Sequence, residues 1–206
     1  MPNLPSTITR RLSPAKPLAA ASVCTLLLAV LLPLVASAAD PKKIGDQVAG
    51  RLFTSLMTTL QEKIASEGPE AAIAYCRLEA LPLTAQIAEE FPQVQSVRRT
   101  ALRVRNSGNQ PDATDRAVLE EWLASWKPAA PPKPVIKQVT TDDGTKAIRY
   151  YRPVPVMATC LACHGSGNEI APNVRAAIAR DYPQDQAVDF QEGDLRGAIV
   201  VTFDAE

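Results

Sequence analysis

Apolar residues recur in strict steps of four from residue 44 to residue 64. The positions are Ile44, Val48, Leu52, Leu56, Leu60 and Ile64, with Phe53 and Met57 beside them. Steps of four place these side chains on one face of an α-helix, so the spacing predicts an amphipathic helix. Gly68 and Pro69 indicate its end and the start of a second helix, which Pro82 bends or restarts. One buried side of this second helix is expected to carry Ala72, Ile73, Cys76 and Ala80.

The pattern changes after residue 96. Alternation from Val97 to Val104 predicts a strand, and Asp112 is a suitable N-cap for a helix that carries Val118, Leu119, Trp122, Leu123 and Trp126. Asp143-Gly144 between two further strand patterns indicates a hairpin. A short helix near 174–180 and a last strand over 195–203 follow. Helices and strands occupy separate stretches, so we predict an α+β fold with a small antiparallel sheet.

The N-terminal 38 residues differ in character from the rest. Basic residues at 10, 11 and 16 precede an apolar run over 18–35, and the small residues Ala36, Ser37 and Ala38 follow it. This three-part layout is typical of a secretory signal peptide, so we predict a signal peptide over 1–38 and periplasmic export. An uncleaved membrane anchor is the alternative, because the apolar stretch is nearly long enough to span a bilayer. We expect membrane association only in that case.

The charge balance narrows the function classes. The 206 residues carry 22 basic and 22 acidic side chains, so the net charge is zero. Nucleic-acid binding needs a basic field that this composition lacks, and we expect no nucleic-acid partner.

Cysteine and histidine positions carry the chemistry. Cys24 lies in the predicted signal peptide, which leaves Cys76, Cys160 and Cys163 in the exported chain. Residues 160–164 read C-x-x-C-H, the attachment pattern of c-type haem, with His164 as the proximal iron ligand. Zinc binding would need further ligands, and a thioredoxin-like pair would need a βαβ context. The sequence therefore predicts one covalently bound haem c.

His164 is the one histidine of the chain, so a second imidazole cannot complete the iron coordination. Cysteine, methionine, lysine, water or an empty position remain for the sixth site. Met57 fits core filling better than ligation, and Met157 is too close in sequence to Cys160 to reach the opposite face. Cys76 fits equally well as a buried small residue or as a ligand.

Four arginines cluster at positions 98, 99, 103 and 105. Such a run is commonly a solvated strand face. In a haem protein, however, two propionates need cationic partners, and Arg99, Arg103 and Arg105 would share one face of the predicted strand. We predict Arg99 and Arg105 as cofactor-binding residues, with Arg105 foremost.

Five sequence blocks in this order resemble a known bacterial family. They are Ala72 to Cys76, Arg99 to Pro111, Cys160 to Gly165, Tyr182 to Ala187, and Gly193 to Gly197. The family comprises exported single-haem c-type proteins with a PAS-like fold, which occur alone or as sensing modules. The resemblance implies a PAS-like haem c-binding domain over 39–206, with His164 and Cys76 as axial ligands. Leu81-Pro82-Leu83-Thr84 departs from the family pattern, in which an Ala-Pro pair often comes sooner after the cysteine.

Two functions follow from these expectations. We favour a haem-based redox or gas sensor, because a thiolate ligand that can leave the iron provides a switch. The alternative is a periplasmic electron-transfer cytochrome c. We expect no enzyme, since a peroxidase needs a distal acid or base and the histidine is already used. No effector sequence follows the last predicted strand, so a separate signalling or redox protein partner is expected.

Overall fold

The computed structural model describes residues 40–141 and 143–205, and the predicted signal peptide lies outside them. Within the described part, no helix has the length and apolar character needed to cross a membrane. The elements in chain order are α1 (Pro41–Glu67), α2 (Pro69–Leu78), α3 (Ala80–Glu89), β1 (Ser96–Thr100), α4 (Ala113–Ser125), β2 (Val135–Thr140), β3 (Lys146–Pro155), α5 (Leu161–His164), α6 (Pro172–Asp181) and β4 (Leu195–Asp204), with 3₁₀ turns at Ser107–Asn109 and Ala158–Cys160.

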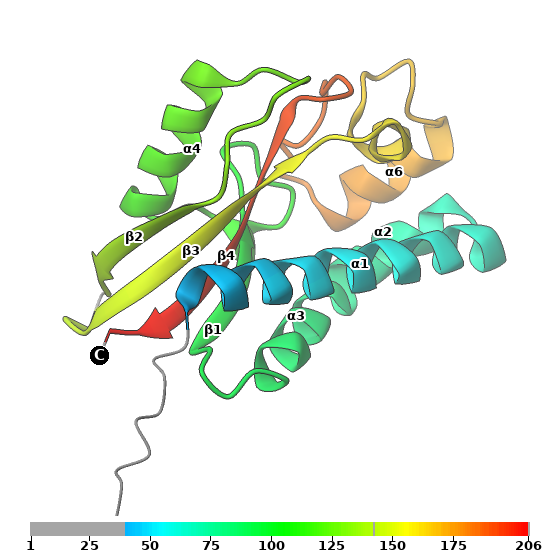
Figure 1. Cartoon of the computed structure of the whole chain (residues 1–206). Coiled ribbons are helices and arrows are strands. Elements are labelled where there is room, and N and C mark those ends of the chain that lie inside the picture. Colours follow the sequence, from blue (N-terminus) through cyan, green and yellow to red (C-terminus); the bar gives the residue numbers. More distant parts are fainter. Residues whose placement is uncertain (1–39, 142, 206) are drawn as a thin grey trace, which may run out of the picture. The chain divides into compact units, whose positions relative to one another are not determined.

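Four strands form one antiparallel sheet in the order β1-β4-β3-β2 (Figure 1). The last strand of the chain, β4, is therefore central, and it is buried along nearly its whole length. A strand covered on both faces needs apolar residues at successive positions, which explains the run from Ala198 to Val201. The predicted α+β class with a small antiparallel sheet is confirmed, and β2 and β3 pair as the hairpin signal predicted.

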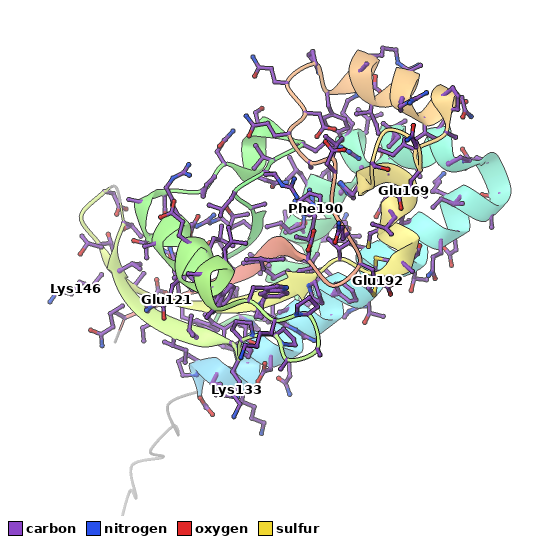
Figure 2. All side chains as sticks on the ribbon, turned by 90° about the horizontal axis from the view of Figure 1, so that it is seen from above. Glu121, Lys133, Lys146, Glu169, Phe190 and Glu192 are labelled. Carbon is purple, nitrogen blue, oxygen red and sulfur yellow. The ribbon has the colours of Figure 1, made fainter. Side chains whose placement is uncertain are left out.

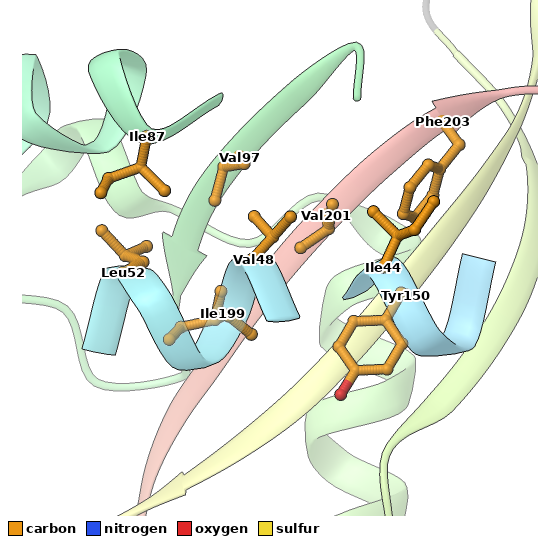
Figure 3. Close-up of a cluster of buried hydrophobic side chains, with 10 residues drawn as sticks. Ile44, Val48, Leu52, Ile87, Val97, Tyr150, Ile199, Val201 and Phe203 are labelled. Atoms are coloured by element: carbon orange, nitrogen blue, oxygen red, sulfur yellow. The ribbon is translucent and has the colours of Figure 1, made fainter. Parts of the chain in front are cut away.

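The first half of α1 packs on one face of the sheet. Its side chains meet residues of β1, β3, β4 and α3 in a cluster that includes Ile44, Val48, Leu52, Ile87, Val97, Tyr150, Ile199, Val201 and Phe203 (Figure 3). Asp40 caps the start of the helix and accepts a hydrogen bond from the Lys42 backbone N–H at 3.0 Å. Gly68 caps its end, with a φ of 87° in the left-handed region that glycine adopts without strain. Pro69 then starts α2, as predicted.

The opposite face of the sheet is covered by α4. Val118, Leu119 and Trp122 pack against Tyr151, Ala198 and Val200. Asp112 caps the helix in a reciprocal arrangement with Asp115, which confirms the predicted N-cap. Asp115 is fully buried and accepts hydrogen bonds from Arg98 at 2.5 Å and from the Tyr151 hydroxyl at 2.9 Å.

Of two predicted boundaries, one was wrong and one was confirmed. The strand β1 ends at Thr100, because its ladder with β4 ends at the pair Thr100–Ala198. Beyond it, Ala101 and Val104 are buried without pairing as a strand, and the Val104 carbonyl accepts from the Gln186 N–H of a loop. The predicted restart of the helix near Pro82 is confirmed: α3 begins at Ala80, so Pro82 falls in its first turn, where a missing N–H costs no hydrogen bond.

Candidate functional site

A cavity lies between the second half of α1, α2, the ends of β1 and β4, and the C-x-x-C-H segment. The α1 wall is apolar and consists of Phe53, Leu56, Met57, Leu60 and Ile64. The four predicted attachment and ligand residues, Cys76, Cys160, Cys163 and His164, also line this cavity. The fold thus brings together residues that are up to 88 positions apart in the chain.

The C-x-x-C-H segment forms a single helical turn. Cys160 ends a short 3₁₀ turn, and α5 carries the chain from Leu161 to His164. Residues three apart on a helix lie on the same side, so both thiols face the cavity. Neither thiol is in a disulfide. Both are therefore available for bonds to a group held in the cavity.

The His164 ring is fixed by a backbone contact. Its Nδ1 lies 2.7 Å from the Ala187 carbonyl oxygen. Because a carbonyl oxygen only accepts hydrogen bonds, Nδ1 is the donor and Nε2 keeps its lone pair. Burial, together with the charges of Arg196 and Arg105, holds the pKa of His164 well below its ordinary value. The imidazole is therefore neutral, as a metal ligand must be.

Phe190 encloses the same ring from another side. The two rings meet edge to face, with centroids 6.3 Å apart, and the Phe190 N–H donates to the His164 carbonyl at 3.0 Å. Phe190, labelled in Figure 2, belongs to the segment between α6 and β4. This segment therefore holds both the backbone and the ring of His164.

Cys76 reaches the cavity from α2. Burial raises the pKa of its thiol, and the nearby charges of Arg99, Arg105 and Arg196 oppose this effect. On the neighbouring turn of α2, Ile73 packs against Val174, Ala177 and Ile178 of α6. The prediction that Cys76 lies on an inward side of its helix agrees with its place on the cavity wall.

The predicted arginines have different surroundings. Arg99 lies on the α1 face of β1 and lines the cavity, and among the described residues its buried Nε has no hydrogen-bond partner. Arg105 also lines the cavity, but it pairs with Asp185 at 2.9 Å. Because β1 ends at Thr100, Arg103 and Arg105 lie beyond the strand and share no strand face with Arg99. The Arg103 guanidinium stacks on Phe190, 3.6 Å from the ring centroid.

Three further residues at this site were not assigned a role from the sequence. Arg196 of β4 lines the cavity, and burial lowers its pKa to about 10. Asp185 pairs with Arg105, and the Ala187 carbonyl holds His164. All three lie within the blocks that carry the family resemblance. No local spacing connects them to residues 160–164, since the contacts form only when the chain folds back.

Both the sequence and the fold of this chain are similar to those of known proteins. Residues 41–203 match the model of the family described as Tll0287-like. The chain belongs to the Tll0287-like family. A solved structure described as the cyanobacterial heme-protein Tll0287 has 25% sequence identity and a TM-score of 0.56, and the match covers 82% of this chain and 98% of that one. No curated protein matches the chain. The predicted relationship to a family that includes a haem protein is confirmed.

Proposed function

We propose that this Tll0287-like chain binds one haem c and acts as a haem-based redox or gas sensor in the periplasm. In this proposal Cys160 and Cys163 attach the cofactor, and His164 and Cys76 are the axial ligands. The single observation that carries it is the gathering of these four residues on one cavity, with Nε2 of His164 left free. The similar fold of the heme-protein Tll0287 supports haem as the cofactor.

The lining of the cavity fits a haem in three respects. The α1 wall offers apolar contact for a porphyrin ring, and the cysteine pair offers two thiols on one side. Haem also carries two propionates, and the cavity contains buried guanidinium groups with unused donors. Arg99 is the clearest case, because its Nε has no partner among the described residues. A buried donor without an acceptor is costly, so an anionic group at this position would satisfy it.

The predicted propionate partners differ in what they can offer. Arg99 can donate from Nε, and Arg196 adds a second positive charge close by. Arg105 uses Nε and Nη2 for Asp185 and two backbone carbonyls, which leaves Nη1 for a propionate. We therefore propose Arg99 and Arg196 as the main partners, with a smaller contribution from Arg105.

A bound haem supplies an iron that changes oxidation state and, when ferrous, binds small gases. The protein residues determine what that change does. His164 is held by Ala187, so the proximal side stays fixed. Cys76 lies on a ten-residue helix between Gly68 and Glu79, where burial favours the neutral thiol. A thiol that leaves the iron on reduction would therefore be stable in protonated form, and the distal site would open.

If Cys76 left the iron, α2 could move, and this movement would change the protein surface. This helix packs on α6, and Glu70 of α2 accepts a hydrogen bond of 2.6 Å from Asn173 of α6. A rotation of α2 would shift both the apolar contact of Ile73 and this exposed bond. Such a surface change is what a separate signalling partner could read.

Cysteine variants test attachment and ligation together. Mature protein made with haem maturation factors should carry haem that resists acid-acetone extraction and gives a c-type pyridine haemochrome spectrum. Cys160→Ser and Cys163→Ser should each lose one thioether, and the double variant should release all haem. The matched control Cys76→Ser should keep the covalent haem but lose the low-spin thiolate signals in electron paramagnetic resonance. Extractable haem in the wild type would refute attachment.

Gas binding separates a sensor from an electron carrier. A sensor should bind CO rapidly once reduced and should change hydrogen exchange over residues 70–90, where α2 and α3 lie. A carrier should keep both ligands in both oxidation states, because unchanged coordination minimises reorganisation. Absence of CO binding, combined with fast electron exchange with a soluble cytochrome, would favour the electron-transfer alternative.

A further inference from the structure

A buried ion pair lies directly behind the proximal histidine. Arg105 and Asp185 are 8% and 7% exposed, and both Nε and Nη2 of Arg105 donate to one carboxylate oxygen, at 3.1 and 2.9 Å. The two residues are 80 positions apart and lie in loops after β1 and before β4. The cost of removing both charges from water offsets most of the attraction within such a pair, so the pair adds little to the stability of the fold.

The pair holds both backbone groups of Ala187. Nη2 of Arg105 donates to the Ala187 carbonyl at 3.1 Å, and the other carboxylate oxygen of Asp185 accepts from the Ala187 N–H at 2.8 Å. The same Nη2 donates to the Cys163 carbonyl at 2.6 Å. Ala187 itself is fully buried. Its carbonyl is the acceptor for Nδ1 of His164, so the pair is one contact away from the proposed iron ligand.

We propose that Arg105 and Asp185 are a positioning pair that sets the orientation and donor strength of His164. This proposal rests on the proposed haem function. A carbonyl that already accepts from a guanidinium has less electron density to offer the imidazole N–H. His164 therefore keeps the character of a neutral imidazole and does not approach imidazolate. Contact of Arg105 with Cys163 ties the same pair to the attachment helix, which fixes the ring relative to the thioethers.

Two readouts on the haem-loaded mature protein test this role. The first is the solvent exchange rate of the Nδ1 proton, which needs little assignment because the chain has one histidine. The second is the reduction potential of the iron. Arg105→Gln should speed Nδ1 exchange about tenfold or more, because the Ala187 carbonyl loses the guanidinium that anchors it and its contact with Nδ1 opens more often. It should also lower the potential, because a positive charge near the iron site is lost.

Two more variants separate positioning from simple charge. Arg175→Gln is the matched control, since Arg175 also donates to a backbone carbonyl, that of Gly167 at 2.5 Å, but neither donates to Ala187 nor lines the cavity. It should leave Nδ1 exchange unchanged and lower the potential only slightly, because its charge is exposed to solvent. Asp185→Asn should raise the potential, because it removes a negative charge, and should still speed exchange, because asparagine cannot anchor Arg105.

Each outcome decides the matter. Faster Nδ1 exchange in Arg105→Gln and Asp185→Asn but not in Arg175→Gln supports the positioning pair. Unchanged exchange in the two pair variants overturns it, whatever the potential does. If Arg105→Gln does not accumulate, the isosteric Asp185→Asn variant carries the test alone. Failure of the wild type to hold covalent haem would refute the proposed function itself, which is a different result from unchanged exchange in a haem-loaded protein.

Discussion

The two halves of α1 have the same hydrophobic spacing and different surroundings. In the first half, Val48 and Leu52 have no exposed surface, because residues of the sheet and of α3 cover them. In the second half, Leu56, Leu60 and Ile64 are only half-buried and line the cavity. A regular apolar spacing thus predicts that a helix face will be covered, but not what covers it. Here the apolar residues line a cavity that the C-x-x-C-H motif also lines, so a cofactor bound in the cavity would cover them.

Truncation of one leucine in each half of α1 tests this difference most directly. Leu52→Ala should lower the free energy of unfolding by about 2–5 kcal/mol, because it leaves a closed cavity in a packed cluster. Leu60→Ala should cost about 1–2 kcal/mol, because its side chain is already partly exposed at the cavity wall. Urea unfolding of the haem-loaded mature protein measures both.

The visible spectrum of the same variants provides the control. Leu60→Ala should shift the haem absorption bands, whereas Leu52→Ala should leave them in place. Equal losses of stability, or equal spectra, would mean that the second half of α1 is ordinary core and that the cavity is not the haem site.

Two glycines of α1 test how closely the helix backbone approaches the sheet. A Cβ at Gly45 would overlap the Tyr150 ring, so the helix backbone lies directly against this side chain of the sheet. Gly45→Ala should lower the free energy of unfolding by about 1–3 kcal/mol through overpacking. At Gly50 the nearest atom is the end of the flexible Arg152 side chain, at 3.3 Å.

Gly50→Ala is therefore the matched control. It should raise the free energy of unfolding by up to about 1 kcal/mol, because alanine is a better helix former than glycine. Thermal unfolding scans of the two variants give the sign of each change. A stabilising Gly45→Ala would contradict the close approach of α1 to Tyr150.

Local signals were sufficient for much of this fold. The i, i+4 spacing predicted α1, Gly68 and Pro69 predicted its end, and Asp112 predicted the cap of α4. These features depend on neighbours within a few residues, so they can be read from the chain directly. The extension of β1 beyond Thr100 was wrong because a strand lasts only as long as its partner, and the pairing with β4 depends on residues about 100 positions away.

The residues of the site also form two groups, those that local sequence spacing identifies and those that it does not. The C-x-x-C-H motif is local, and its residues were named from spacing alone. Arg196, Asp185 and Ala187 have no such spacing and act through contacts with residues far away in the chain. Arg98 and Arg99 illustrate the difference, since adjacent strand residues point to opposite faces. Arg98 reaches Asp115 under α4, and Arg99 reaches the cavity.

The α4 face provides the last and smallest test, because it adds a buried ionic network around Asp115 to its apolar contacts, whereas the cluster between α1 and the sheet is apolar. Burial raises the pKa of Asp112, but the hydrogen bonds from the Asp115 backbone and Arg149 outweigh this effect, so the folded-state pKa is lowered. A carboxylate with a lowered pKa stabilises the fold above its unfolded pKa of about 3.9, and this contribution is lost as the pH falls through the folded value. Asp112→Asn keeps an acceptor at the N-cap but removes the charge.

At pH 7 this variant should lose about 0.5–1 kcal/mol of unfolding free energy, since solvent screens a carboxylate that is this exposed. As the pH falls below 4, its difference from the wild type should shrink toward zero, because the wild-type carboxylate becomes protonated. Urea unfolding at pH 7, 4 and 3 measures this convergence, with the exposed Glu62→Gln as a control for general charge effects. The difference between Leu52→Ala and the wild type should stay constant over the same range, because no charge is involved. A pH-independent difference for Asp112→Asn would mean that the α4 cap acts through hydrogen bonding alone and that the two faces of the sheet do not differ in their ionic character.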